Sequence, residues 1–277
     1  MLEPLTVVLK VALYAGLLSA SGAVFAQATL RPSPDEATYL TRIMRRGATL
    51  ILIVCPLSVL VLILRLGGEF DGPTLSAVFG SNSGAALALQ VTGAFLLLTA
   101  AGDDDSVLLR LSYALLPVLG FAFSGHAAGI SPVDGFVAVV HVSMAAWWLG
   151  SLYYLRRGCE QMPFDRLVAV LSRFSSLAFV LTGVLVICGL VLIVILVDFS
   201  NDPWLTLYGW ILGAKLCVVA GLLAVAGYNR RRLTPRLLTG DSNAVATLRR
   251  TTSAELLLIA MVLTITAILT TYASPHD

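Results

Sequence analysis

The sequence predicts an all-α membrane protein, a bundle of about eight transmembrane helices with both termini on the non-cytoplasmic side. Hydrophobic residues make up 58% of the 277 residues and charged residues only 12%, and the mean hydropathy is +0.90. Soluble domains are about half apolar and about a quarter charged, so the composition excludes a soluble protein of this size. The third observation is that stretches of about 20 apolar residues, the length that crosses a bilayer core, recur along the chain.

Eight such windows follow one another, separated by short polar segments. They fall at 5–28, 48–66, 82–101, 107–126, 134–155, 172–198, 207–228 and 253–272. Because they occupy most of the chain, we expect a single transmembrane domain over residues 1–277. The third and fourth windows are separated by Asp103, Asp104 and Asp105, and three adjacent carboxylates predict a tight exposed turn.

The distribution of basic residues predicts the orientation. Fifteen of the 18 lie in or beside alternate connections, namely those after the first, third, fifth and seventh windows. The opposite connections, near 67–81, 127–133 and 199–206, contain none. Cytoplasmic loops carry the excess of lysine and arginine, so both termini are expected outside the cytoplasm.

The first window has a second interpretation, because Val24–Ala28 resembles a signal-peptidase site. A signal peptide also needs a basic segment ahead of its apolar stretch. Here Glu3 lies near the start and no basic residue precedes Lys10, so we expect the window to be the first membrane helix.

Several function classes lack support in the sequence. The basic residues are scattered over short loops, which argues against nucleic-acid binding. The four cysteines are widely spaced and form no CxxC pair, so neither a disulfide framework nor a zinc site is expected. No phosphate-binding loop is present, and we expect no enzymatic activity.

All three histidines map to the outward side, and two of them are candidate metal ligands. His141 and Met144 are three residues apart on a predicted helix and share one face. Imidazole and thioether together suit copper, and His126, at the end of the preceding helix, is expected near the same place. Trp147 either packs against a bound cation or fills a helix interface. Alternatively, His141 bonds a neighbouring helix and Met144 only packs.

Charged residues inside membrane helices are candidates by default. Lys215 lies about eight residues into its window and needs a partner, for which Asp198 is nearest by depth. Either a structural or a transport role is open for Lys215. Glu255 opens the last window, where we expect it to cap the helix or to pair with Arg230–Arg232.

These segments together resemble the copper resistance protein D (CopD) family of bacterial inner-membrane proteins. Gly125-His126-Ala127 resembles a family motif, and the run from His141 to Gly150 resembles its histidine helix, with Ser151 in place of a second glycine. The further matching segments are Arg173-Phe174-Ser175-Ser176, Tyr208-Gly209-x-x-Leu212-x-x-Lys215, Asn229-Arg230-Arg231-Arg232-Leu233-x-Pro235-x-Leu237, and Leu248-Arg249-Arg250 before Glu255-Leu256. The resemblance is densest over 120–275.

The resemblance implies transport of copper, as Cu(I) or Cu(II), across the inner membrane, usually towards the cytoplasm. It also implies a small periplasmic copper carrier of the CopC type, which here would be a separate protein. Two alternatives stay open. A b-type cytochrome would hold one haem through His126 and His141 or through His141 and Met144. A copper-sensing or assembly subunit would have no conduction path.

Overall fold

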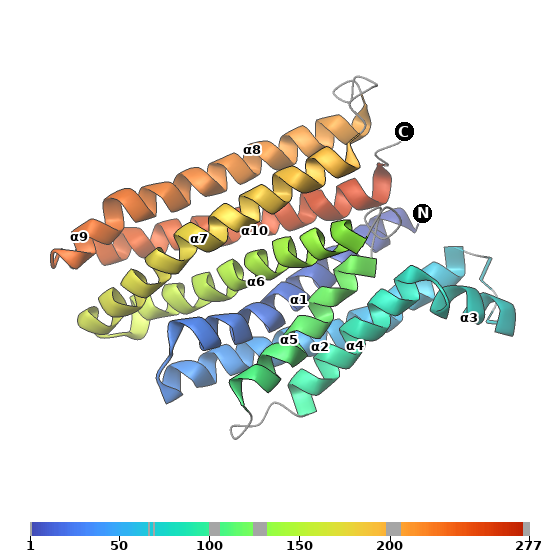
Figure 1. The fold of residues 1–277 in the computed structure, drawn as a ribbon, viewed down its shortest axis with the longest axis horizontal. Coiled ribbons are helices and arrows are strands. Elements are labelled where there is room, and N and C mark those ends of the chain that lie inside the picture. The colour runs from blue at the N-terminus through green and yellow to red at the C-terminus, as the bar shows by residue number, and fades with distance from the viewer. Residues whose placement is uncertain are drawn as a thin grey trace.

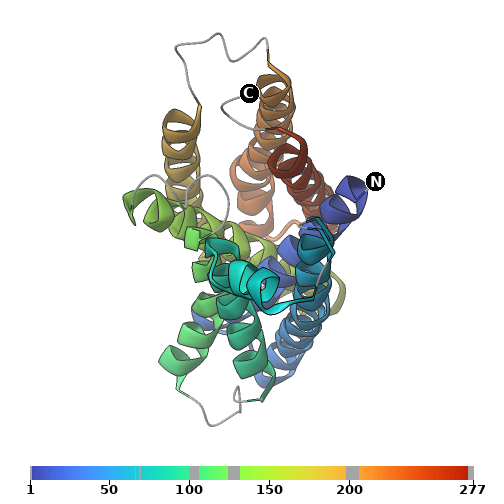
Figure 2. The ribbon, with the colours of Figure 1, turned by 90° about the vertical axis from the view of Figure 1, so that its right-hand side faces the viewer.

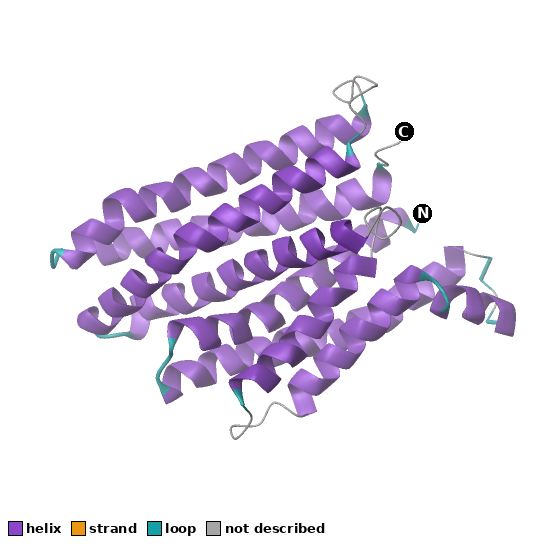
Figure 3. Ribbon diagram, viewed as in Figure 1, coloured by secondary structure: helices purple, strands orange, loops and turns teal. Residues whose placement is uncertain are grey.

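The computed structural model describes residues 2–65, 67–68, 70–99, 106–123, 132–197 and 206–273, and within these ranges it contains helices and no strand. Figure 3 shows that the loops are confined to the helix ends. The helices are α1 (Glu3–Leu30), α2 (Pro34–Arg65), α3 (Gly72–Phe79), α4 (Asn82–Thr99), α5 (Val107–Leu119), α6 (Pro132–Gln161), α7 (Phe164–Leu196), α8 (Leu207–Tyr228), α9 (Thr234–Leu238) and α10 (Ala244–Tyr272). A 3₁₀ turn, η1 (Gly120–Phe123), follows α5, and a π-helical turn, η4 (Asn229–Leu233), joins α8 to α9.

The prediction of an all-α polytopic membrane protein is confirmed. By length and composition, seven helices in the described part are able to cross a membrane, and the remaining predicted window, the fourth, is the shorter apolar helix Val107–Phe123. Large apolar side chains on α7 are exposed, including Phe179, Ile187 and Val194. This is the arrangement expected where a helix faces lipid rather than water.

The helices form two groups around a central pair. Figures 1 and 2 show α2, α4 and α5 on one side of α1 and α6, and α7, α8 and α10 on the other. Both ends of the chain lie at the same end of the bundle (Figure 1), as an even number of crossings requires. α7 packs mainly on α6, and α8 mainly on α10.

Several helices extend beyond the predicted windows at the end opposite the termini. The α2 helix begins at Pro34 rather than near residue 48, and α10 begins at Ala244 rather than near 253. Arg42, Arg45 and Arg46, expected in a loop, are therefore helical. Hydropathy detects only the part of a helix that lies in hydrocarbon, so charged extensions at the membrane surface escape it.

Glycines allow α1 to cross closely over α6 and over α2. A Cβ atom built on Gly22 would lie 2.0 Å from the carbonyl oxygen of Ala146, and one on Gly150 would lie 2.0 Å from that of Gly22. Gly16 and Gly47 bring α1 and α2 together in the same way. Small residues drive such packing between membrane helices, because they let the two backbones approach.

Polar contacts join the helices at both ends. Near the termini, the Lys10 Nζ atom donates to the Thr270 carbonyl at 2.6 Å and links α1 to α10. At the opposite end, Glu36 forms an ion pair with Arg166 at 2.7 Å and accepts a hydrogen bond from the Tyr154 hydroxyl at 2.6 Å. The second network joins α2, α6 and α7.

Candidate functional site

The His141 side chain on α6 is directed at the backbone of α7. Its Nδ1 atom lies 3.0 Å from the carbonyl oxygen of Leu185. A carbonyl oxygen only accepts, so the hydrogen bond requires the proton on Nδ1 and leaves the lone pair on Nε2. Within the described residues, Nε2 has no hydrogen-bond partner. Metal-binding histidines are commonly oriented in this way, with the second ring nitrogen donating to a carbonyl or carboxylate.

Gly189 makes room for this ring, and sequence reasoning missed it. A Cβ atom at Gly189 would lie 3.0 Å from Cε1 and 3.5 Å from Nδ1 of His141. Gly189 comes one helical turn after Leu185, so both contacts are on one face of α7. A glycine inside an apolar helix indicates a close approach of another group. The sequence does not show that this group is the ring of a histidine 48 positions away.

Lys215 approaches the same histidine from α8. An electrostatic interaction links the Lys215 ammonium group to His141. The Lys215 side chain forms no hydrogen bond or ion pair with any residue in the described ranges. Asp198, its predicted partner, lies outside those ranges. Three helices thus bring an imidazole, a backbone carbonyl and an ammonium group to one region of the bundle.

The other predicted copper ligands are placed only in part. Met144 is partly buried and lies one helical turn from His141 on α6, as the spacing requires. His126 lies outside the described residues, so its convergence with His141 and Met144 stays a prediction. Among the residues that the structure describes, no group of three or more histidine, cysteine, aspartate or glutamate side chains is arranged to hold a metal ion.

Trp147 has the environment of a helix-interface residue. Its indole Nε1 donates to the Thr29 hydroxyl at 2.8 Å, and its ring stacks on Phe174 with the centroids 5.6 Å apart. The side chain is 3% exposed. These contacts join α6 to α1 and α7, which favours the interface interpretation over a cation-binding one.

Glu255 corrects a prediction. It lies well inside α10, which begins at Ala244, so it does not cap that helix, and it forms no ion pair in the described part. Instead, its carboxylate accepts hydrogen bonds from Trp148 Nε1 at 3.2 Å and from Asn229 Nδ2 at 2.6 Å. The prediction is wrong because the first turns of α10 are polar, so hydropathy does not detect them and places the start of the helix too close to Glu255.

The Glu255 cluster is a buried polar junction between α6, α10 and the turn η4 that follows α8. Glu255 is 3% exposed, and Asn229 is the first residue of the π-helical turn η4. Single π-helical turns inside helices are frequent at functional sites. A carboxylate in such a place is costly unless hydrogen bonds satisfy it, and two of them do so here.

The fold and these buried groups define a class: a polytopic membrane protein with ionisable side chains between its helices, one of them a histidine hydrogen-bonded across the contact between α6 and α7. Residues 1–136 match the family model described as "Copper resistance protein D-like, N-terminal domain", and residues 168–269 match "Copper resistance protein D". The chain belongs to the copper resistance protein D family. No curated protein and no solved structure matches it.

Membership of this family gives the chain a role in copper resistance or transport as a multi-pass inner-membrane protein. The second match covers Leu185, Gly189, Lys215 and Glu255. His141 lies between the two matched regions.

Proposed function

We propose that the protein carries copper ions through the inner membrane from the periplasm to the cytoplasm. Three observations support this. The chain belongs to a copper resistance family, the Nε2 atom of His141 has no hydrogen-bond partner in the described residues, and the basic residues orient the His141 end of α6 towards the periplasm. The His141 geometry is the observation that carries the proposal.

In this account, copper is captured by His141 and Met144, with His126 as a third ligand or gate. A thioether and an imidazole form a soft-to-borderline donor pair that suits copper better than the harder divalent cations. The hydrogen bond from Nδ1 to Leu185 holds the ring in one orientation, so capture does not need to order it.

The ion then passes along the side of α6 that carries His141, where the charge of Lys215 on α8 acts on the imidazole. The positive charge of Lys215 repels a copper ion bound near it and so weakens the binding of that ion. A weakly bound ion leaves the site more readily, which conduction requires. Glu255, held by Trp148 and Asn229, lies further along α10 towards the arginine-bearing end. We assign it the structural role of joining three helices beside the route.

Transport from the periplasm also requires that copper be delivered to the outward end of the bundle. We propose a separate periplasmic carrier of the CopC type, which would release its ion at the outward end of α6. A copper-sensing subunit would require neither delivery nor a route through the bundle.

Copper uptake into proteoliposomes tests the transport function. Purified protein is reconstituted, copper is added outside under reducing conditions, and a copper chelator dye trapped in the lumen reports its entry. The proposal predicts a time-dependent signal above that of protein-free vesicles. Equal signals in the two preparations would leave a non-conducting role in copper resistance.

A further inference from the structure

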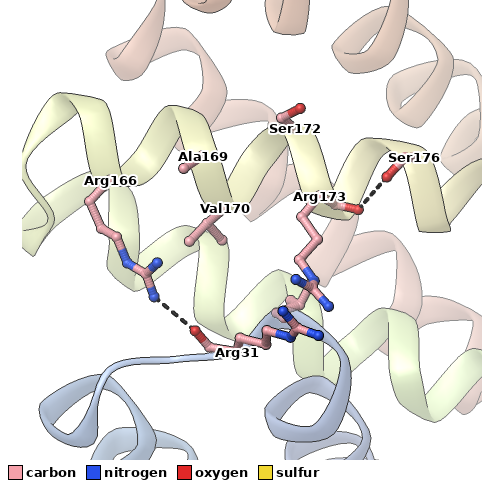
Figure 4. A pocket seen from close by; sticks show the side chains of 8 residues that line it. Arg31, Arg166, Ala169, Val170, Ser172, Arg173 and Ser176 are labelled. Atoms are coloured by element: carbon pink, nitrogen blue, oxygen red, sulfur yellow. Dashed lines mark hydrogen bonds between the residues drawn. The ribbon is translucent and has the colours of Figure 1, made fainter.

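A cavity of about 350 Å³ lies at the end of the bundle opposite the chain termini, between the last residues of α1 and the first turns of α7. Three arginines line it, together with serines and apolar residues, and no acidic residue does. In the view of Figure 4, the guanidinium groups of Arg31 and Arg173 lie close together, and that of Arg166, bonded to the Arg31 carbonyl oxygen, lies further along α7. The route proposed for copper does not use this cavity.

The three arginines differ in the hydrogen-bond and ion-pair partners of their guanidinium groups. Arg166 is neutralised by Glu36 at 2.7 Å and also donates to the Arg31 carbonyl oxygen at 3.0 Å. Arg173 donates from Nε to the Thr29 carbonyl oxygen at 2.5 Å, which fixes its orientation and leaves its terminal nitrogens without a partner in the described residues. The Arg31 side chain makes no hydrogen bond or ion pair within the same ranges.

The backbone holds Arg31 in this place at a cost. Its φ is 53°, and it is the only residue other than glycine with a positive φ in the described part of the chain. As the residue that follows α1, it occupies a left-handed position where glycine or asparagine is usual. Arg31 has an unpaired side chain and an unfavourable backbone conformation, and it lines the same cavity as Arg173, whose terminal nitrogens are unpaired in the described residues; together these features indicate a binding role.

We propose that this cavity binds a phosphate group, supplied either by the headgroup of an anionic phospholipid or by free phosphate. The planar fork of arginine matches phosphate oxygens in pairs, and two unneutralised guanidinium groups lower the free energy of an anion between them. The volume lies in the range of small-ligand sites. By the arginine distribution this end faces the cytoplasm, where basic pockets between membrane helices bind lipid headgroups.

The test uses the full-length protein in a neutral detergent. Native mass spectrometry counts the copies of phosphatidylglycerol and phosphatidylcholine that stay bound, and thermal unfolding is followed against inorganic phosphate. The informative variant is Arg31→Gln, because its side chain has no polar contact whose loss would unfold the protein. Arg173→Gln is the second variant, and Arg156→Gln is the control, since it removes an exposed arginine paired with Glu160.

If a lipid headgroup is the ligand, the wild type retains phosphatidylglycerol in preference to phosphatidylcholine, and both pocket variants bind it about tenfold more weakly. If free phosphate is the ligand, phosphate raises the wild-type Tm and does not raise that of Arg31→Gln. Arg156→Gln behaves as wild type in either case. An Arg31→Gln variant with wild-type responses to both probes, or an equal loss in Arg156→Gln, overturns the proposal.

Discussion

The Nδ1 atom of His141 donates a hydrogen bond to the carbonyl oxygen of Leu185, 3.0 Å away on the neighbouring helix. This contact sets the tautomer and the direction of the ring at once. The two ring nitrogens therefore have different roles: Nδ1 holds the ring against α7, and Nε2 is left for a ligand.

His141→Asn separates these two roles. The amide nitrogen of asparagine occupies about the place of Nδ1 and retains a donor for Leu185, but nothing replaces Nε2. We expect copper affinity to fall at least about tenfold while the Tm stays close to that of the wild type. Titration against a chromophoric copper chelator measures the affinity. An unchanged affinity would mean that Nε2 is not a ligand.

Gly189→Ala tests the fit of the ring against α7. The added methyl group would lie 3.0 Å from Cε1, so we expect a loss of about 1–3 kcal/mol in stability or displacement of the ring with weaker copper binding. Gly183→Ala on the same helix is the matched control, because a Cβ atom there meets nothing within 4 Å. Helix propensity predicts that the control gains up to about 1 kcal/mol. Two variants with the same unfolding free energy and copper affinity would contradict the packing described.

Lys215→Met removes the positive charge that interacts with His141 and keeps most of the side-chain volume. Repulsion of a bound cation disappears, so copper should bind severalfold more tightly and leave more slowly. Lys10→Met is the control, since Lys10 bonds Thr270 on another helix pair. The same chelator competition measures both variants, and weaker binding by Lys215→Met would show that the ammonium group supports the site.

Glu255→Ala leaves the buried Trp148 donor and the partly buried Asn229 donor without their acceptor. Each unsatisfied donor costs about 1–3 kcal/mol, so we expect a clear loss of stability and a changed Trp148 fluorescence. Glu255→Gln retains one acceptor and should lose less. Glu160→Ala removes an exposed partner of Arg156 and should change stability by less than about 1 kcal/mol. Unfolding in denaturant compares the three, and a Glu255→Ala variant as stable as Glu160→Ala would refute the junction.

The fold was largely readable from the sequence because a bilayer imposes a simple rule on it. The length of the apolar stretches located the helices. The arginine-bearing connections predict both termini on one side of the membrane, and the two chain ends lie at the same end of the bundle (Figure 1). The starts of α2 and α10 were misplaced, since hydropathy carries no information about charged helical turns at the surface. That one error also produced the wrong environment for Glu255.

The site was readable only as a set of residue types. His141 and Met144 share a face because three residues separate them on one helix, which spacing alone establishes. Contacts between helices cannot be predicted in the same way. They depend on how each helix is rotated about its axis and on the angle at which two helices cross, and no local sequence pattern specifies either. Neither the contact with the Leu185 carbonyl nor the space at Gly189 was therefore predictable. The sequence likewise does not show that Arg31 and Arg173 line one cavity with Arg166.

The initial rate of copper uptake by His141→Ala proteoliposomes tests the central claim most directly. His276→Ala, which removes a histidine from the C-terminal tail, is the matched control, and equal amounts of each protein are reconstituted. The account predicts that His141→Ala falls at least about tenfold, towards the rate of protein-free vesicles, while His276→Ala retains the wild-type rate. Uptake by His141→Ala at the wild-type rate would contradict it.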